Sequence, residues 1–106
     1  MNTKLTNLLT VCNKAGMLSF GFDAAKEAAL SGKARLILVT SDASAKTVKE
    51  ISYYCGKVKV KVPVVHIDYT MPEVHKHIGR KAAVLSVKDD GFAKRVKSII
   101  GEEAYD

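Results

Sequence analysis

The sequence has few cysteines and no long hydrophobic run. Its two cysteines, Cys12 and Cys55, are too far apart in the chain to form a local metal-binding pair. No hydrophobic segment approaches the length that spans a membrane, and the chain does not open with a signal-peptide pattern. We therefore expect a cytoplasmic protein whose two thiols are reduced and mostly buried.

The sequence also lacks the motifs of common catalytic and cofactor sites. Its glycines fit neither a dinucleotide-binding fingerprint nor a phosphate-binding loop, and there is no Gly-x-Ser-x-Gly elbow. Its three histidines are His66, His75 and His77. Because His75 and His77 are two positions apart on a predicted helix, they point to different sides and cannot chelate a metal together. We expect a protein that is not an enzyme and needs no cofactor or metal.

Positive charge is in excess. Seventeen Lys and Arg residues stand against eleven Asp and Glu, which gives a formal net charge of +6. Such a charge attracts polyanions and makes nucleic acid a candidate partner. The segment 57–62, "KVKVKV", has two interpretations. It is an edge or loop segment that lysine keeps soluble and unpaired, or a row of phosphate contacts.

Helix-like and strand-like segments alternate over what we expect to be one domain, residues 1–106. Apolar residues at helical spacing, with glycines that stop the pattern, predict helices over 4–15, from 23 to Gly32, from 44 to Gly56, from 70 to Gly79, and from 89 onward. Aliphatic runs predict strands over 17–20, 34–41, 62–67 and 82–87, the last three buried. This alternation predicts a three-layer α/β/α sandwich.

The segment 19–28, "SFGFDAAKEA", leads from a short strand into a helix. Gly21 can adopt a positive φ, and Asp23 fits an N-cap. The first amides of such a helix suit a phosphate, although the charge of Asp23 opposes one. Phe22 either stacks on an unpaired base or packs beneath the neighbouring loop. These residues alone favour a capped helix start, with Gly21 or Phe22 at its exposed N-terminus.

Several longer segments carry a family resemblance. In chain order they are "SGKARLILVTSDAS", "VPVV", "HIGRKAAVLSV" and "GFAKRVKSI". With them the chain resembles the ribosomal protein L7Ae family, and within it the small bacterial YlxQ-like branch, over about residues 5–100. The resemblance implies a sandwich around a central four-stranded mixed sheet. It also implies binding of structured RNA, typically a kink-turn.

In that family the RNA-reading motif has the pattern Gly-x-Asn-Glu-x-x-Lys at the start of the second helix, which falls on residues 21–27. Gly21 matches the pattern. Asp23 occupies the Asn position and keeps a hydrogen-bond acceptor. Ala24 replaces the Glu, and Glu27 occupies the Lys position, with Lys26 beside it.

A second contact region implied by the resemblance is the segment 86–90, "SVKDD", which would close over a flipped-out base. The residues predicted to bind RNA are Gly21, Phe22, Asp23, Lys26, Lys33, Val87 and Lys88. The predicted function is that of a non-catalytic, monomeric RNA-binding protein, ribosomal or ribosome-associated, with ribosomal RNA or a kink-turn RNA as partner. The alternative, favoured by Ala24 and Glu27, is a protein-interaction module on the same fold that has lost sequence-specific RNA reading.

Overall fold

The computed structural model describes residues 3–105. These residues form five helices and four strands in alternating order: α1 (Thr3–Lys14), β1 (Leu18–Phe20), α2 (Phe22–Leu30), β2 (Leu36–Val39), α3 (Ala45–Lys57), β3 (Val64–His66), α4 (Met71–Ile78), β4 (Val84–Val87) and α5 (Asp90–Tyr105). Every predicted element is present, with ends that differ by a few residues. None of the helices in this part of the chain has the length and apolar composition to cross a bilayer.

The four strands form one mixed sheet in the order β1-β4-β2-β3. Strand β4 is antiparallel to both of its neighbours, whereas β2 and β3 are parallel. Every residue of β2 and β4 is buried, because both strands are central and covered on both faces. The prediction of a buried strand over 62–67 is wrong in part. Strand β3 is shorter, lies at the edge of the sheet and is only half-buried.

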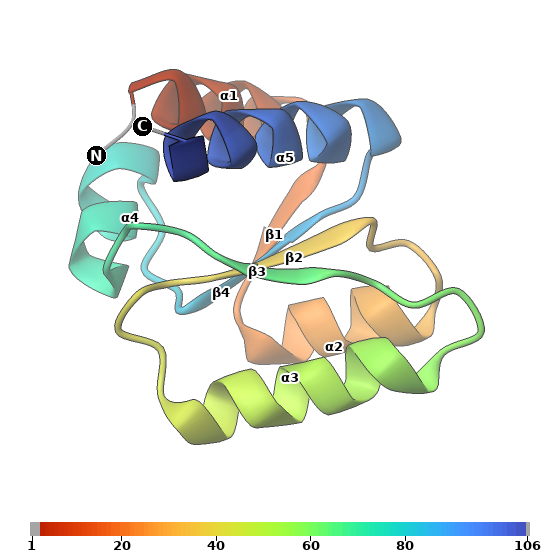
Figure 1. The fold of residues 1–106 in the computed structure, drawn as a ribbon. Coiled ribbons are helices and arrows are strands. Elements are labelled where there is room, and N and C mark those ends of the chain that lie inside the picture. Colours follow the sequence, from red (N-terminus) through yellow and green to blue (C-terminus); the bar gives the residue numbers. More distant parts are fainter. Residues whose placement is uncertain (1–2, 106) are drawn as a thin grey trace.

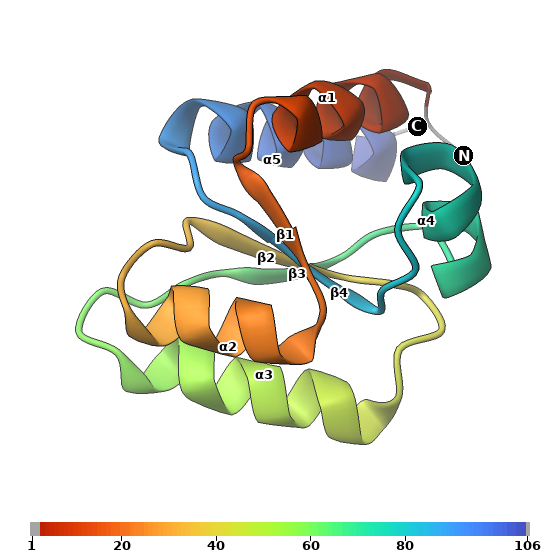
Figure 2. The same cartoon turned by 180° about the vertical axis from the view of Figure 1, so that it is seen from behind.

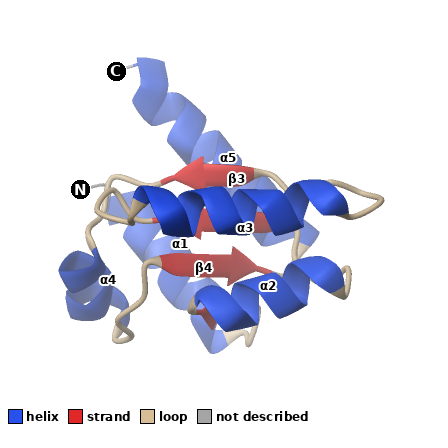
Figure 3. Cartoon of the chain, turned by 90° about the horizontal axis from the view of Figure 1, so that it is seen from below, coloured by secondary structure: helices blue, strands red, loops and turns tan. Residues whose placement is uncertain are grey.

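Helices cover both faces of the sheet, as Figures 1 and 2 show: α1, α4 and α5 lie on one face, and α2 and α3 on the other. Figure 3 shows α2 and α3 side by side in front of the strands. Each face has its own hydrophobic core. Leu9 of α1 and Leu38 of β2 belong to the first, and Ala25 of α2 and Ile51 of α3 to the second. The predicted three-layer α/β/α sandwich with a four-stranded mixed sheet is confirmed.

Local sequence explains where α3 begins and where α4 begins and ends. The Ser44 hydroxyl accepts a hydrogen bond from the Thr47 N–H at 3.1 Å and caps α3. At α4, Thr70 and Glu73 form a reciprocal capping box, and Gly79 ends the helix with a φ of 95°. The starts of both helices and the end of α4 agree with the sequence-based predictions, whereas Gly56 does not end α3, which continues to Lys57.

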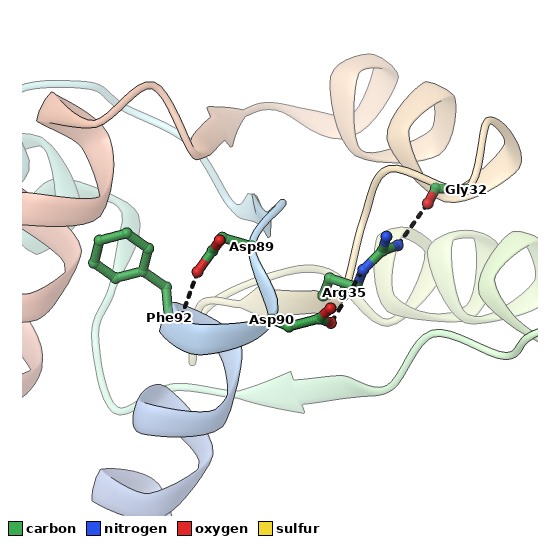
Figure 4. A network of polar contacts seen from close by, with 5 residues as sticks. All are labelled: Gly32, Arg35, Asp89, Asp90 and Phe92. Carbon is green, nitrogen blue, oxygen red and sulfur yellow. Dashed lines mark hydrogen bonds and ion pairs between the residues drawn. The ribbon is translucent and has the colours of Figure 1, made fainter.

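The start of α5 is fixed by two carboxylates, as Figure 4 shows. Asp89 Oδ2 accepts a hydrogen bond from the Phe92 N–H at 2.9 Å. Asp90 Oδ1 lies 3.1 Å from Arg35 Nε, and the Arg35 guanidinium also donates to the Gly32 carbonyl at 2.6 Å. The segment that opens α5 is therefore tied to the loop that follows α2.

Both cysteines lie in the hydrophobic cores, so the prediction of buried free thiols is confirmed. Burial raises the pKa of Cys12 to about 11, with a further contribution from the negative charge of Asp89. Burial also raises the pKa of Cys55. Because the thiolate is the reactive form, we expect Cys12 in the folded protein to react with an aromatic disulfide reagent at pH 8 about 100-fold more slowly than in denaturant, and we expect Cys55 to react more slowly as well. Fast labelling of either thiol in the native protein would contradict this expectation.

Candidate nucleic-acid interface

Three connections meet at one end of the sheet, where β1 and β2 end and β4 begins. The Gly21 N–H donates to the Val84 carbonyl at 2.8 Å. The Thr40 N–H donates to the Ala83 carbonyl at 2.9 Å. The turn between β1 and α2, the start of the β2–α3 connection and the end of the α4–β4 connection therefore lie side by side.

The turn from β1 into α2 places a glycine at the helix N-cap. Gly21 has a φ of 101° and a ψ of 160°, and no side chain caps the helix. The first amides of α2 therefore lack a side-chain acceptor, and the positive end of the helix dipole is only half-buried. The prediction that Gly21 lies at an exposed helix N-terminus is confirmed. The predicted N-cap role of Asp23 is wrong, because the helix begins at Phe22 and Asp23 falls in its first turn.

Two cations border this turn, and each lies over an aromatic ring. Lys26 Nζ is 4.3 Å from the centroid of the Tyr54 ring. Arg80 Cζ is 4.9 Å from the centroid of the Phe20 ring. Phe22 packs edge-to-face against Tyr54, with ring centroids 6.4 Å apart. The half-exposed Phe22 ring is therefore anchored by a packing contact on α3.

We refer to Phe20, Gly21, Phe22, Lys26 and Arg80 together as the corner surface. It combines a helix start that no side chain caps with two cations whose positions are restrained by ring contacts. Reasoning from the sequence missed Arg80. This residue lies within the segment "HIGRKAAVLSV", which carries the family resemblance, but its contact with Phe20 depends on the long-range pairing of β1 with β4.

Lys33 and Lys88 lie at the other end of α2. They share a shallow hollow of about 160 Å³, whose lining also includes Ala24 and Glu27. The backbone N–H of Lys88 donates to the Met17 carbonyl at 2.8 Å, next to the start of β1. The structure therefore brings Lys33 and Lys88 together but separates them from Gly21 by the length of α2, about 13 Å for nine residues.

The structure does not place Val87 on the surface. Its side chain is fully buried, and the residue pairs with Leu18 on one side and Leu36 on the other. The prediction that 86–90 is a loop is therefore wrong in part, because only Lys88 and Asp89 lie between β4 and α5. Its first two residues belong to β4, and Asp89 and Asp90 are used to fix the start of α5.

The described residues form no candidate metal-binding site at this end of the sheet. Within 3–105, no three His, Cys, Asp or Glu side chains come close enough together to hold a metal ion. His75 and His77 lie exposed on α4.

Comparisons with known proteins agree with this architecture. The chain is 31% identical over 101 residues to the RNA-binding protein YlxQ of Enterococcus faecium, and the alignment covers 92% of this chain and 91% of that protein. It is also 31% identical over 94 residues to the RNA-binding protein YlxQ of Bacillus subtilis, with 88% and 91% covered.

Solved structures share the fold. A Bacillus halodurans protein of unknown function superposes with a TM-score of 0.84 at 27% identity, over 94% of this chain and 99% of that one. The Giardia lamblia 15.5kD RNA binding protein superposes with a TM-score of 0.72 at 22% identity, over 96% and 89%.

The family model that matches residues 3–97 is that of the ribosomal protein L7Ae/L30e/S12e/Gadd45 family. The match covers nearly all of the described chain, and the resemblance seen in the sequence is confirmed. The chain belongs to the ribosomal protein L7Ae/L30e/S12e/Gadd45 family.

Proposed function

We propose that this protein is a non-catalytic RNA-binding protein, ribosomal or ribosome-associated, that binds structured RNA of the kink-turn type through the corner surface. One observation carries the proposal: α2 begins without a side-chain cap directly after Phe20, whose ring is contacted by Arg80, and Lys26 in the same helix lies over the Tyr54 ring. The curated relatives named as RNA-binding proteins support it.

Each part of the corner surface suits a phosphate group. Backbone N–H groups at a helix N-terminus bind anions without a side chain. The planar guanidinium of Arg80 can donate two parallel hydrogen bonds to a phosphate. Asp23 is exposed beside them and can accept a hydrogen bond from a base amino group or a ribose hydroxyl. The corner surface is therefore suited to a folded RNA backbone.

Lys33 and Lys88 extend this surface along α2. Their shallow hollow is also lined by Ser19 of β1, so it follows the edge of the sheet from the corner surface. Ala24 and Glu27, which lie between, supply no donor for a base edge. We therefore propose that phosphate contacts and RNA shape provide most of the affinity, and base-specific contacts little.

The test is equilibrium binding to a kink-turn RNA, a plain duplex and a single strand over a range of salt concentrations. Each phosphate that a Lys or Arg neutralises should contribute about −0.7 to −0.9 to the slope of log K against log salt. With Lys26, Lys33, Arg80 and Lys88 engaged, we expect a slope of about −3 and tighter binding to the kink-turn than to the single strand. Absence of binding to all three RNAs at low salt would refute the proposal.

The second candidate is a protein-interaction module on the same fold. Ala24 and Glu27 favour it, because they remove a carboxylate and reverse a charge in the family's RNA-reading pattern. The same titrations separate the two candidates. A module that has lost RNA binding should show no salt-dependent association with any of the three RNAs.

A further inference from the structure

A second surface lies on α3, next to the corner surface. Lys46, Lys49, Tyr53 and Lys57 recur at intervals of three or four residues, so they form one outward stripe of the helix. All four are exposed, and the Tyr53 side chain is 60% exposed. Figure 3 shows α3 and α2 together on one face of the sheet, and the exposure of the four residues means that no other described element covers the stripe.

The stripe borders a hollow. Its volume is about 570 Å³, and its lining consists of Lys46, Lys49, Glu50, Tyr53 and Tyr54. Two lysines, Lys46 and Lys49, stand against the single carboxylate of Glu50 in the hollow. The hollow thus combines two aromatic side chains with a net positive charge, the combination that binds unpaired nucleotides.

The Tyr53 ring is restrained before any ligand arrives. Tyr54 meets it edge-to-face, with centroids 5.3 Å apart and planes at 75°. Lys57 Nζ lies 5.4 Å from the Tyr53 ring centroid. Because the Tyr53 ring is already held in place in the free protein, less conformational entropy is lost when a ligand stacks on it.

Ring contacts connect this platform to the corner surface. Tyr54 touches Tyr53 on one side, and on the other it contacts Phe22 and lies under Lys26. An RNA bound at the corner surface therefore lies next to the hollow. This continuity, together with the lysines, favours RNA over a protein as the occupant.

We propose that the α3 hollow is a second RNA subsite that takes an unpaired nucleotide next to the structured RNA held at the corner surface. The base stacks on the Tyr53 ring, and the flanking phosphates pair with Lys46 and Lys49. Stacking accepts any base, because every base has a π-face. The subsite therefore selects RNAs by an unpaired extension and not by its sequence. This inference rests on the proposed function.

The test compares two RNAs that share one kink-turn, the first blunt-ended and the second with an unpaired extension of about four nucleotides, a length within the range that single-strand sites accommodate. We expect the protein to bind the extended RNA about tenfold more tightly, the scale of one stacked base. Tyr53→Ala should abolish that gain and leave the affinity for the blunt RNA unchanged. Tyr53→Phe, which keeps the ring, should retain the gain.

Val11→Ala serves as the control, because Val11 is an exposed apolar residue of α1 on the opposite face of the sheet. This variant should keep both affinities. If the protein binds neither RNA, the proposed function fails and the subsite with it. If both RNAs bind equally well and Tyr53→Ala has no effect, the subsite is refuted while the proposed function stands, and a protein becomes the better candidate for this face.

Discussion

Reversing the charges of Lys26 and Arg80 together is expected to lower the affinity for structured RNA by on the order of 100-fold at low salt. Each substitution removes a proposed phosphate contact and places a carboxylate where the RNA backbone would lie. The slope of log K against log salt should also become shallower by about 1.5, since two counterion-releasing contacts are lost. Equilibrium titration of the wild type and of the Lys26→Glu, Arg80→Glu double variant over a range of salt concentrations measures both effects.

The chain offers a matched control on α5. Lys94 and Arg95 match Lys26 and Arg80 in residue type. Both are exposed and belong to α5, on the opposite face of the sheet from α2. Lys94→Glu with Arg95→Glu changes the net charge by the same amount, so the control variant should keep most of the affinity. Equal losses in the two double variants would mean that binding follows net charge and not the corner surface. Thermal melts of both variants exclude unfolding as the cause.

Gly21→Ala is expected to destabilise the protein by about 1–3 kcal/mol, the cost of a side chain held in a backbone region that is nearly exclusive to glycine. The reason is the φ of 101°, because no atom lies within 4 Å of the position that a Cβ would occupy at Gly21. The cost is therefore strain in the backbone and not a clash. Denaturant unfolding measures it as a lower midpoint with an unchanged slope.

Gly56→Ala tests the same substitution without the strain. Gly56 lies in α3, has no positive φ, and has no atom within 4 Å of its would-be Cβ. Alanine is the better helix former, so this variant should be more stable by up to about 1 kcal/mol. Opposite signs for the two variants would support the account of Gly21. Destabilisation of similar size at both positions would contradict it.

Local chemistry made most of the fold predictable. The glycines and the Thr70–Glu73 capping box mark helix ends within a few residues, and aliphatic runs mark the two central strands. The start of α2 was less predictable. Both Gly21 and Asp23 are acceptable N-caps, and the choice depends on the Gly21 N–H, which bonds to Val84 in a different strand.

The candidate interface was only half predictable, because tertiary contacts assemble it. Gly21, Phe22 and Lys26 lie within one short segment, which family resemblance identified. Arg80 joins them only because β1 pairs with β4. The family resemblance implies that Val87 contacts RNA, although the aliphatic run 82–87 predicts a buried strand, and the pairing on both sides of Val87 does bury it.

The strand order also determines when during synthesis the corner surface can form. Strand β4 is the last strand to leave the ribosome, yet it occupies a central position between β1 and β2. Until β4 emerges, β1 has no partner strand, and the Gly21 N–H lacks its acceptor on Val84. A nascent chain that ends before residue 84 can therefore form α2 but cannot hold the turn at its start. The corner surface is thus completed only after β4 has emerged, and a product truncated before β4 would carry the segment 21–27 without the turn geometry described above.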